Sequence, residues 1–125
     1  MQYDLDTHSE QAELFLYLRA IILTFETINE VKNAKQTTYK DRYSAVCMLR
    51  VRKGVVRLSF GNGTKMQTMF SELLGEAKFV RYLEFEAIEN VQKERIEAMV
   101  QESQLINMEK YELQKLRCNA IKASR

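Results

Sequence analysis

Apolar positions near the N-terminus follow the spacing of an amphipathic helix. They recur every three or four residues at Leu14, Leu18, Ile21, Ile22 and Phe25. Just before them, residues 7–10 read Thr-His-Ser-Glu, which fits a capping box at a helix start. Leu5 is placed to pack back onto the first turn as a hydrophobic staple. We therefore predict a helix from about residue 8 to about residue 25.

In the middle of the chain the pattern changes to alternation. Residues 43–52 and 55–60 are separated by Lys53-Gly54, so they predict a hairpin with a two-residue turn. In the second strand, Val56, Leu58 and Phe60 fall on one face, and the residues between them fall on the other.

Two flanking segments extend this sheet. The polar, β-capable residues 35–39 predict a third, edge strand, and the alternating residues 79–85 predict a fourth strand. Between the sheet strands, residues 66–74 predict a helical turn or a short helix that ends at Gly75.

The last third of the chain reads as one long helix beginning near residue 93. Its first apolar stripe comprises Ile96, Met99, Val100, Ser103 and Ile106. Later apolar residues drift out of phase with it: Leu105, Met108, Leu113, Leu116 and Ile121. The drift indicates a bend near Asn107 or a second covered surface, either packed on the domain or paired with a second copy as a homodimer.

These elements predict a single α+β domain. It has an N-terminal helix, an antiparallel sheet of about four to five strands and a long C-terminal helix. We assign residues 1–103 to the domain and residues 104–125 to a C-terminal helical extension of it. A length of 125 residues with 46% hydrophobic content is consistent with one folded domain.

Composition and charge narrow the class of protein. Two Cys are too few for a disulfide framework, which favours a reducing cytoplasm, and charges interrupt every apolar run, which argues against a membrane protein. The net charge of +2 conceals alternating blocks, since residues 1–30 are acidic and residues 31–53 are basic. Such blocks either hold segments of one fold together or recruit a partner.

Residue types that usually carry catalysis or metal binding are scarce. His8 is the only histidine and falls beside an acidic terminus, Cys47 lies in an apolar strand, and Cys118 lies near the C-terminus. No nucleophile–base pair or zinc ligand set can be read from them. The glycines of residues 61–65 lack the spacing of a phosphate-binding loop. An enzyme is therefore disfavoured, although the sequence does not decide the point.

A series of short motifs follows the hairpin. Residues 47–63 hold the two strands and their Lys-Gly turn, and Glu72-Leu73-Leu74-Gly75, a basic strand at 78–83 and Ile-Glu-Asn-Val at 88–91 come next. In order and spacing these segments resemble the YdhG-like family, a group of small bacterial proteins mostly of unknown function, over residues 18–103. The Trp-Gly-x-Pro motif typical of that family is missing, and Asn33-Ala34-Lys35-Gln36 stands at the corresponding place.

The resemblance implies one candidate ligand, because some members are described as frataxin-like iron chaperones. Carboxylate oxygens suit hard iron ions, so the candidate metal residues are Asp4, Asp6, Glu10 and Glu13. Glu10 and Glu13 are three residues apart on the predicted helix. The alternative is structural, since acids at a helix N-terminus also stabilise the helix dipole.

Basic and aromatic residues form the second candidate site. The candidate ligand or partner face comprises Tyr39, Tyr43, Arg50, Arg52 and Arg57. A sheet that displays Arg and Tyr contacts phosphates and stacks bases, but the acidic segments disfavour nucleic acid as the partner. Pairing of these cations with the acidic helices is the structural alternative.

Together these observations predict a non-enzymatic cytoplasmic binding or chaperone-like module with an unidentified ligand, which the resemblance suggests is related to iron. The alternative function is an interaction protein that binds an anionic polymer or an acidic partner through a basic sheet face.

Overall fold

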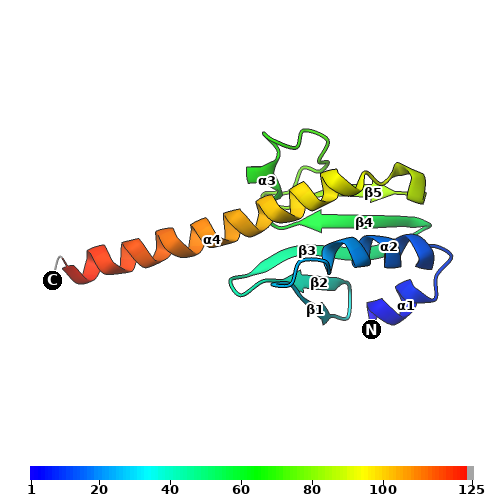
Figure 1. The fold of residues 1–125 in the computed structure, drawn as a ribbon, viewed down its shortest axis with the longest axis horizontal. Coiled ribbons are helices and arrows are strands. Elements are labelled where there is room, and N and C mark those ends of the chain that lie inside the picture. The colour runs from blue at the N-terminus through cyan, green and yellow to red at the C-terminus, as the bar shows by residue number, and fades with distance from the viewer. Residues whose placement is uncertain (124–125) are drawn as a thin grey trace.

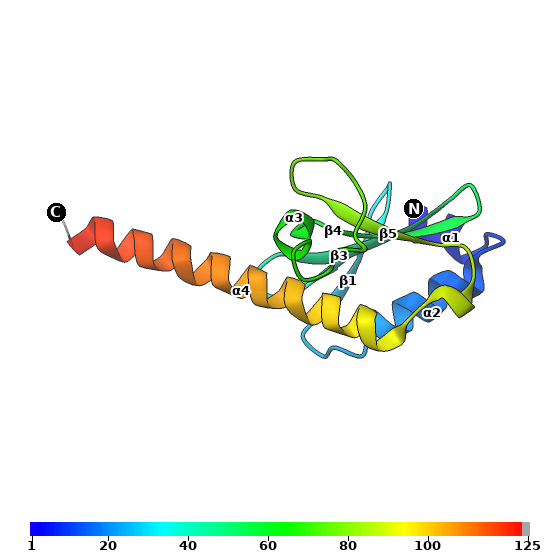
Figure 2. The same ribbon diagram turned by 90° about the horizontal axis from the view of Figure 1, so that it is seen from above.

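A computed structural model describes residues 1–123 and shows an α+β fold in two layers (Figures 1 and 2). Five strands form one sheet, and α2 and α4 lie together on one of its faces, leaving the other face without a helix over it. The elements in chain order are α1 (Gln2–Thr7), α2 (Ala12–Ile22), β1 (Asn29–Lys32), β2 (Thr37–Lys40), β3 (Ala45–Arg52), β4 (Val55–Phe60), α3 (Gly63–Met66), β5 (Arg81–Phe85), the 3-10 helix η1 (Ile88–Asn90) and α4 (Lys93–Ala123). The predicted fold class is confirmed.

The sheet is an antiparallel meander in the order β1-β2-β3-β4-β5. The predicted hairpin is confirmed: β3 pairs with β4 in a register that places Leu49 opposite Leu58. Lys53 and Gly54 both have positive φ, 53° and 77°, as a two-residue hairpin turn that follows the twist of its strands requires. This turn fixes which side chains of β3 and β4 share a face.

The edge of the sheet differs from the prediction. Residues 35–39 were expected to give the edge strand, but β2 lies inside the sheet and β1 forms that edge. The short sequence of β1, Asn-Glu-Val-Lys, has three exposed residues, so it lacks the apolar alternation that marks a half-buried strand.

The N-terminal helix also differs from the prediction, because two helices replace one. The predicted capping box does not form: residues 8–11 connect α1 to α2, and the Ser9 hydroxyl donates a hydrogen bond to the Asp6 carbonyl. Leu5 is 68% exposed and is not a staple. The Asp6 carboxylate accepts the Val51 amide N–H at 3.2 Å, which holds α1 beside the C-terminal end of β3 before the chain turns into α2.

The hydrophobic core lies between the sheet and its helices. The apolar stripe of α2 and the first stripe of α4 are buried against the inner face of β3 and β4, whose fully buried side chains include Leu49, Leu58 and Phe60. Because apolar side chains of these three layers remove their surface from water together, the core fixes both helices on the same face of the sheet.

A buried polar cluster joins α4 to the loop after β4. The Asn62 amide donates to the Ser103 carbonyl and hydroxyl, both at 3.2 Å, and to Asn107 Oδ1 at 2.9 Å. The Ser103 hydroxyl donates to the Val46 carbonyl at 2.7 Å, and the Asn107 amide reaches the Ala45 carbonyl at 3.1 Å. These hydrogen bonds replace water for polar groups of five residues.

Beyond this cluster α4 continues without a break and extends away from the domain (Figure 1). The bend that was one explanation of the shifted apolar pattern is therefore absent from Lys93–Ala123, and residues 108–123 are exposed. Residues 124–125 of the predicted extension lie outside the described residues. None of the helices in residues 1–123 combines the length and apolar character needed to cross a membrane.

Replacing Asn107 by Ala tests whether the polar cluster holds α4 in place. We expect N107A to lower the free energy of unfolding by about 2–3 kcal/mol, because it removes hydrogen bonds to buried groups. The measurement is equilibrium denaturation. Q114A, an exposed change on the same helix, serves as the control and should alter stability by less than about 0.5 kcal/mol. Equal stability of the two variants would contradict this role.

Candidate functional site

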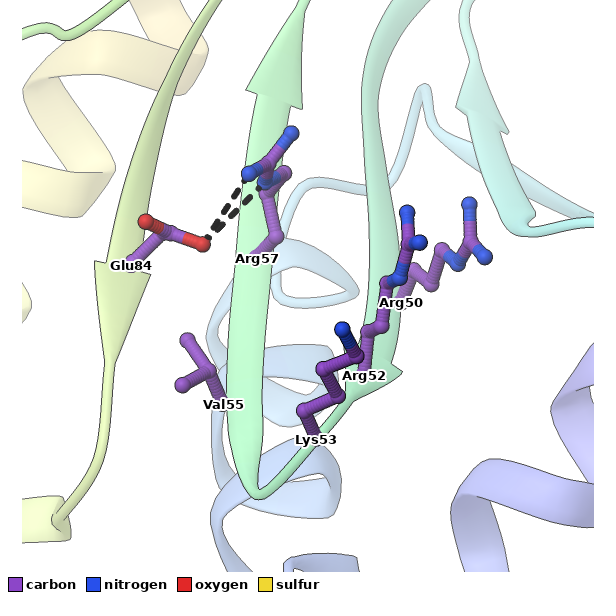
Figure 3. Close-up of a pocket in the computed structure, with 6 residues that line it drawn as sticks. All are labelled: Arg50, Arg52, Lys53, Val55, Arg57 and Glu84. Atoms are coloured by element: carbon purple, nitrogen blue, oxygen red, sulfur yellow. Dashed lines mark hydrogen bonds and ion pairs between the residues drawn. The ribbon is translucent and has the colours of Figure 1, made fainter.

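The face of the sheet opposite the helices carries a group of cations. Arg50 and Arg52 of β3 and Arg57 of β4 project from it, and Lys53 lies in the turn between the two strands (Figure 3). With Val55 and Glu84 they line a hollow of about 280 Å³. We call the four cations Arg50, Arg52, Lys53 and Arg57 the basic face.

Two of these arginines stand directly opposite each other. The register of β3 and β4 pairs Arg50 with Arg57, and the register of β4 and β5 pairs Arg57 with Glu84. Like charges in directly opposed positions destabilise a sheet. The Arg50–Arg57 pair is therefore a cost to the fold, and only one of its members has a carboxylate across the next strand.

Arg57 is held in place by its neighbours on β5. Its Nη2 and Nε lie 3.1 and 3.3 Å from Glu84 Oε2, and its guanidinium carbon lies 3.8 Å from the centre of the Tyr82 ring. This ion pair is partly exposed, so water and salt weaken it. The contact with Tyr82 orients the guanidinium without neutralising it.

The other three cations of the basic face differ from Arg57 in their surroundings. Within residues 1–123, Arg50, Arg52 and Lys53 form no ion pair. Arg52 and Lys53 are exposed, whereas Arg50 is half-buried and its Nε has no hydrogen-bond partner in the described part of the chain. A buried N–H group without a partner carries an unrecovered desolvation cost.

A buried carboxylate lies close to the basic face. Burial raises the pKa of Asp6 above its usual value, although hydrogen bonds from Gln2 and the Val51 amide and the charge of Arg50 act in the opposite direction. Asp6 Oδ2 has no partner among the described residues. Asp6 is 1% exposed, and it forms no ion pair with Arg52 or Lys53.

The four candidate metal residues do not converge. Asp4 is exposed beside the N-terminal amine, Asp6 is buried against β3, and Glu10 and Glu13 are exposed on the connection and on α2. Within residues 1–123, no three Asp, Glu, Cys or His side chains are gathered as metal ligands. The N-terminal acids therefore do not fit an iron site of several carboxylates.

The predicted partner face is only partly assembled by the structure. Arg50, Arg52 and Arg57 lie together, but Tyr39 is fully buried on the helix-covered side of the sheet. Tyr43 lies in the loop before β3 and packs against Tyr111 of α4, with ring centres 5.0 Å apart. Two aromatic residues of the expected face are thus parts of the protein's own packing.

Sequence reasoning missed Lys53, Tyr82 and Glu84. The two-residue turn predicts the register that sets Arg52 opposite Val55 and Arg50 opposite Arg57. Lys53 is part of that turn and could therefore have been added to the predicted face from the sequence. Tyr82 and Glu84 of β5 could not have been added in this way. Twenty residues separate β4 from β5, so turn geometry does not determine the register of these two strands.

Residues with potential reactivity are dispersed. Cys47 is buried in β3, where burial raises the pKa of its thiol well above the usual value, and Cys118 is exposed on α4. The Nδ1 atom of His8 lies 2.8 Å from the Asp4 carbonyl oxygen at the end of α1. Each of these side chains belongs to a different element of the fold.

Comparisons of the chain with protein-family models, with curated proteins and with solved structures find no match.

Tyr39 belongs to a partly buried charged cluster that predicts a pH effect. Its hydroxyl donates to Glu30 Oε2 at 3.0 Å, and Arg19 contacts both oxygens of Glu30, at 2.6 and 3.0 Å. Burial alone would raise the pKa of Glu30, but the hydrogen bonds from Arg19 and Tyr39 lower it below its usual value. The cluster therefore stabilises the fold above the pKa of unfolded Glu30, and this contribution disappears as pH falls through the folded pKa.

We expect E30Q to unfold more easily than the wild-type protein by about 1–3 kcal/mol at neutral pH, because a charged hydrogen-bond acceptor is lost. The two proteins should become similar in stability in acid, where Glu30 is protonated. Denaturation across pH measures this, with the exposed E26Q as the matched control. A constant stability difference between E30Q and the wild-type protein down to low pH would contradict the assignment.

Proposed function

We propose that this protein is a non-enzymatic cytoplasmic binding module that holds an acidic segment of a partner protein on its basic face. The observation that carries the proposal is the Arg50–Arg57 pair, in which like charges face each other across β3 and β4. Only Arg57 has a carboxylate partner, Glu84 of β5. A bound anion placed between the two guanidinium groups would turn this repulsion into attraction.

The chemistry of the basic face suits carboxylates. A guanidinium presents a planar fork of N–H donors that matches the two oxygens of a carboxylate, and hydrogen bonds between charged partners are stronger than neutral ones. Three arginines and Lys53 surround one hollow of about 280 Å³, which has room for a side-chain carboxylate but not for a large folded ligand. The proposed ligand is therefore a short acidic peptide segment.

Nucleic acid fits this face less well than an acidic protein. Proteins that bind single strands stack bases on accessible aromatic rings. Here Tyr39 is buried, Tyr43 packs on Tyr111, and the guanidinium of Arg57 lies over the Tyr82 ring. The cations are also confined to one end of the sheet, whereas a polynucleotide gains affinity from a long run of phosphate contacts.

Two further proposals come from the sequence. Membership of the YdhG-like family and a role with iron rest on the motifs of residues 18–103, and the dispersed positions of Asp4, Asp6, Glu10 and Glu13 give iron binding no added support. A homodimer through the C-terminal helix would carry two basic faces, and this would strengthen binding to a partner with repeated acidic segments.

Binding of a fluorescent acidic peptide rich in Glu and Asp tests the proposal. We expect the wild-type protein to bind it in low salt and to release it as salt rises, because exposed charges are screened. R50Q/R52Q should weaken binding by about tenfold, equivalent to about 1.4 kcal/mol. E84Q should strengthen binding several-fold, because it frees Arg57 from its own carboxylate.

K93Q/K122Q is the matched control, since it removes the same charge from exposed positions on α4. It should leave the affinity for the peptide within about twofold of the wild-type value. An equal loss in R50Q/R52Q and K93Q/K122Q, or no binding by the wild-type protein in low salt, would reject the basic face as the site. Tighter binding of a single-stranded oligonucleotide of equal charge would reject the acidic-protein assignment.

A further inference from the structure

The basic face gathers more positive charge around one hollow than a single carboxylate balances. Its four cations line the hollow of about 280 Å³, and within residues 1–123 Glu84 is the one acidic residue of the lining. Glu84 already pairs with Arg57, whereas the other three cations have no ion pair in the described part of the chain. A ligand that fits this hollow therefore carries concentrated negative charge.

The strands that carry these cations are tied together at one end. Lys53 and Gly54 form the two-residue turn between β3 and β4. The side-chain amide of Gln11 donates to the Gly54 carbonyl at 2.7 Å and to the Glu86 carbonyl at 2.8 Å, so one residue joins this turn to the end of β5. The backbone that presents the cations is therefore already ordered before a ligand binds, which lowers the entropic cost of binding.

The two opposed arginines keep donors for a ligand. Arg57 uses Nε and Nη2 on Glu84 Oε2, at 3.3 and 3.1 Å, so its Nη1 takes no part in that contact (Figure 3). Arg50 Nε is buried, so a ligand reaches Arg50 through its Nη atoms. Residues directly opposite each other in an antiparallel pair have Cβ atoms about 4.5–5.5 Å apart. One compact anion between the strands can therefore accept from both guanidinium groups.

A phosphate monoester fits this pair better than a carboxylate. A carboxylate brings one negative charge and two oxygens in one plane, so it balances one guanidinium. A phosphate monoester carries a charge of about −1.5 to −2 near neutral pH and three terminal oxygens that point in different directions. It can accept hydrogen bonds from Arg50 and from Arg57 while it balances both charges.

The carboxylates of an extended acidic peptide spread their charge along the face instead. Consecutive side chains of an extended segment point to opposite sides, and alternate ones lie about 7 Å apart. Arg50 and Arg52 have the same spacing, since they are two residues apart on β3. Flanking carboxylates therefore suit Arg52 and Lys53, and the opposed pair suits a group that concentrates two charges at one point.

We infer that the basic face binds a phosphorylated side chain within the acidic segment of its partner, with the phosphate between Arg50 and Arg57 and flanking carboxylates at Arg52 and Lys53. Phosphorylation of the partner then controls binding, because it adds the group that matches the opposed pair. This inference rests on the proposed function of the basic face, and it names the group that the face recognises.

Two fluorescent peptides of equal length measure this preference. One carries a phosphoserine flanked by Glu, and the other replaces the phosphoserine and one neutral residue by Glu, so that both have the same formal charge. We expect the phosphopeptide to bind the wild-type protein about tenfold more tightly than the charge-matched peptide in the same low-salt buffer, because the opposed arginines contact its phosphate.

The variants R50Q and R52Q separate the opposed pair from the rest of the basic face. R50Q removes one member of the pair and should reduce the preference for the phosphopeptide to about threefold or less. R52Q is the matched control, because it removes the same charge from the same face but Arg52 stands opposite Val55. It should weaken binding of both peptides and keep the preference. A preference that R50Q leaves unchanged would contradict binding between Arg50 and Arg57.

The comparison of peptides also separates this inference from the proposed function. Equal affinities for the two peptides would overturn the inference and leave the proposed function intact, whereas no binding of either peptide in low salt would reject both. Inorganic phosphate, added as a competitor, should displace the phosphopeptide only at concentrations about a hundredfold above the dissociation constant of the peptide, because it lacks the flanking carboxylates. Displacement at concentrations close to that constant would assign the hollow to free phosphate and overturn the assignment to a protein segment.

Discussion

The hydrogen bonds of Asn62 determine how far α4 covers the sheet. Its amide is held by Ser103 and Asn107, and these contacts fix the helix against the ends of β3 and β4. Upstream of them the apolar stripe of α4 joins the core with α2, and downstream the helix leaves the domain (Figure 1). Both α2 and α4 lie on one face of the sheet (Figure 2), so neither of these helices covers the cations on the opposite face.

The basic face and the distal part of α4 each carry a free-energy cost in the folded chain. On the sheet, Arg50 opposes Arg57, which costs stability. On α4, leucine side chains remain in water, which also leaves free energy unrecovered. A chain that folds around one well-packed core tolerates such costs most readily where a ligand or partner removes them. The proposal for the basic face follows from this reasoning, through charge.

Local sequence patterns predicted most elements of the fold, whereas contacts between distant residues determine which side chains form the candidate site. The alternation of Val56, Leu58 and Phe60 and the Lys53-Gly54 turn predicted the hairpin, and hence the arginines that share its outer face. The sequence could not show which face of the sheet Tyr39 lies on. That face depends on the register of β2 with β3, which the loop of residues 41–44 and a bulge between Tyr39 and Lys40 alter. The division of the N-terminal helix was hidden for a similar reason, since the segment around it makes contacts with distant residues, among them Asp6 with Val51 and Gln11 with the Gly54 and Glu86 carbonyls.

The most direct test of the central claim follows the side-chain Nε–H signals of the arginines by NMR while an acidic peptide is added. Arg50 Nε has no partner within the described residues, and Arg57 is only partly neutralised, so their signals should shift together with a common saturation curve. Arg95, which is paired with Glu72 on another part of the surface, should remain unchanged. Shifts at Arg95 without shifts at Arg50 and Arg57, or no shift at any arginine at saturating peptide, would contradict the account.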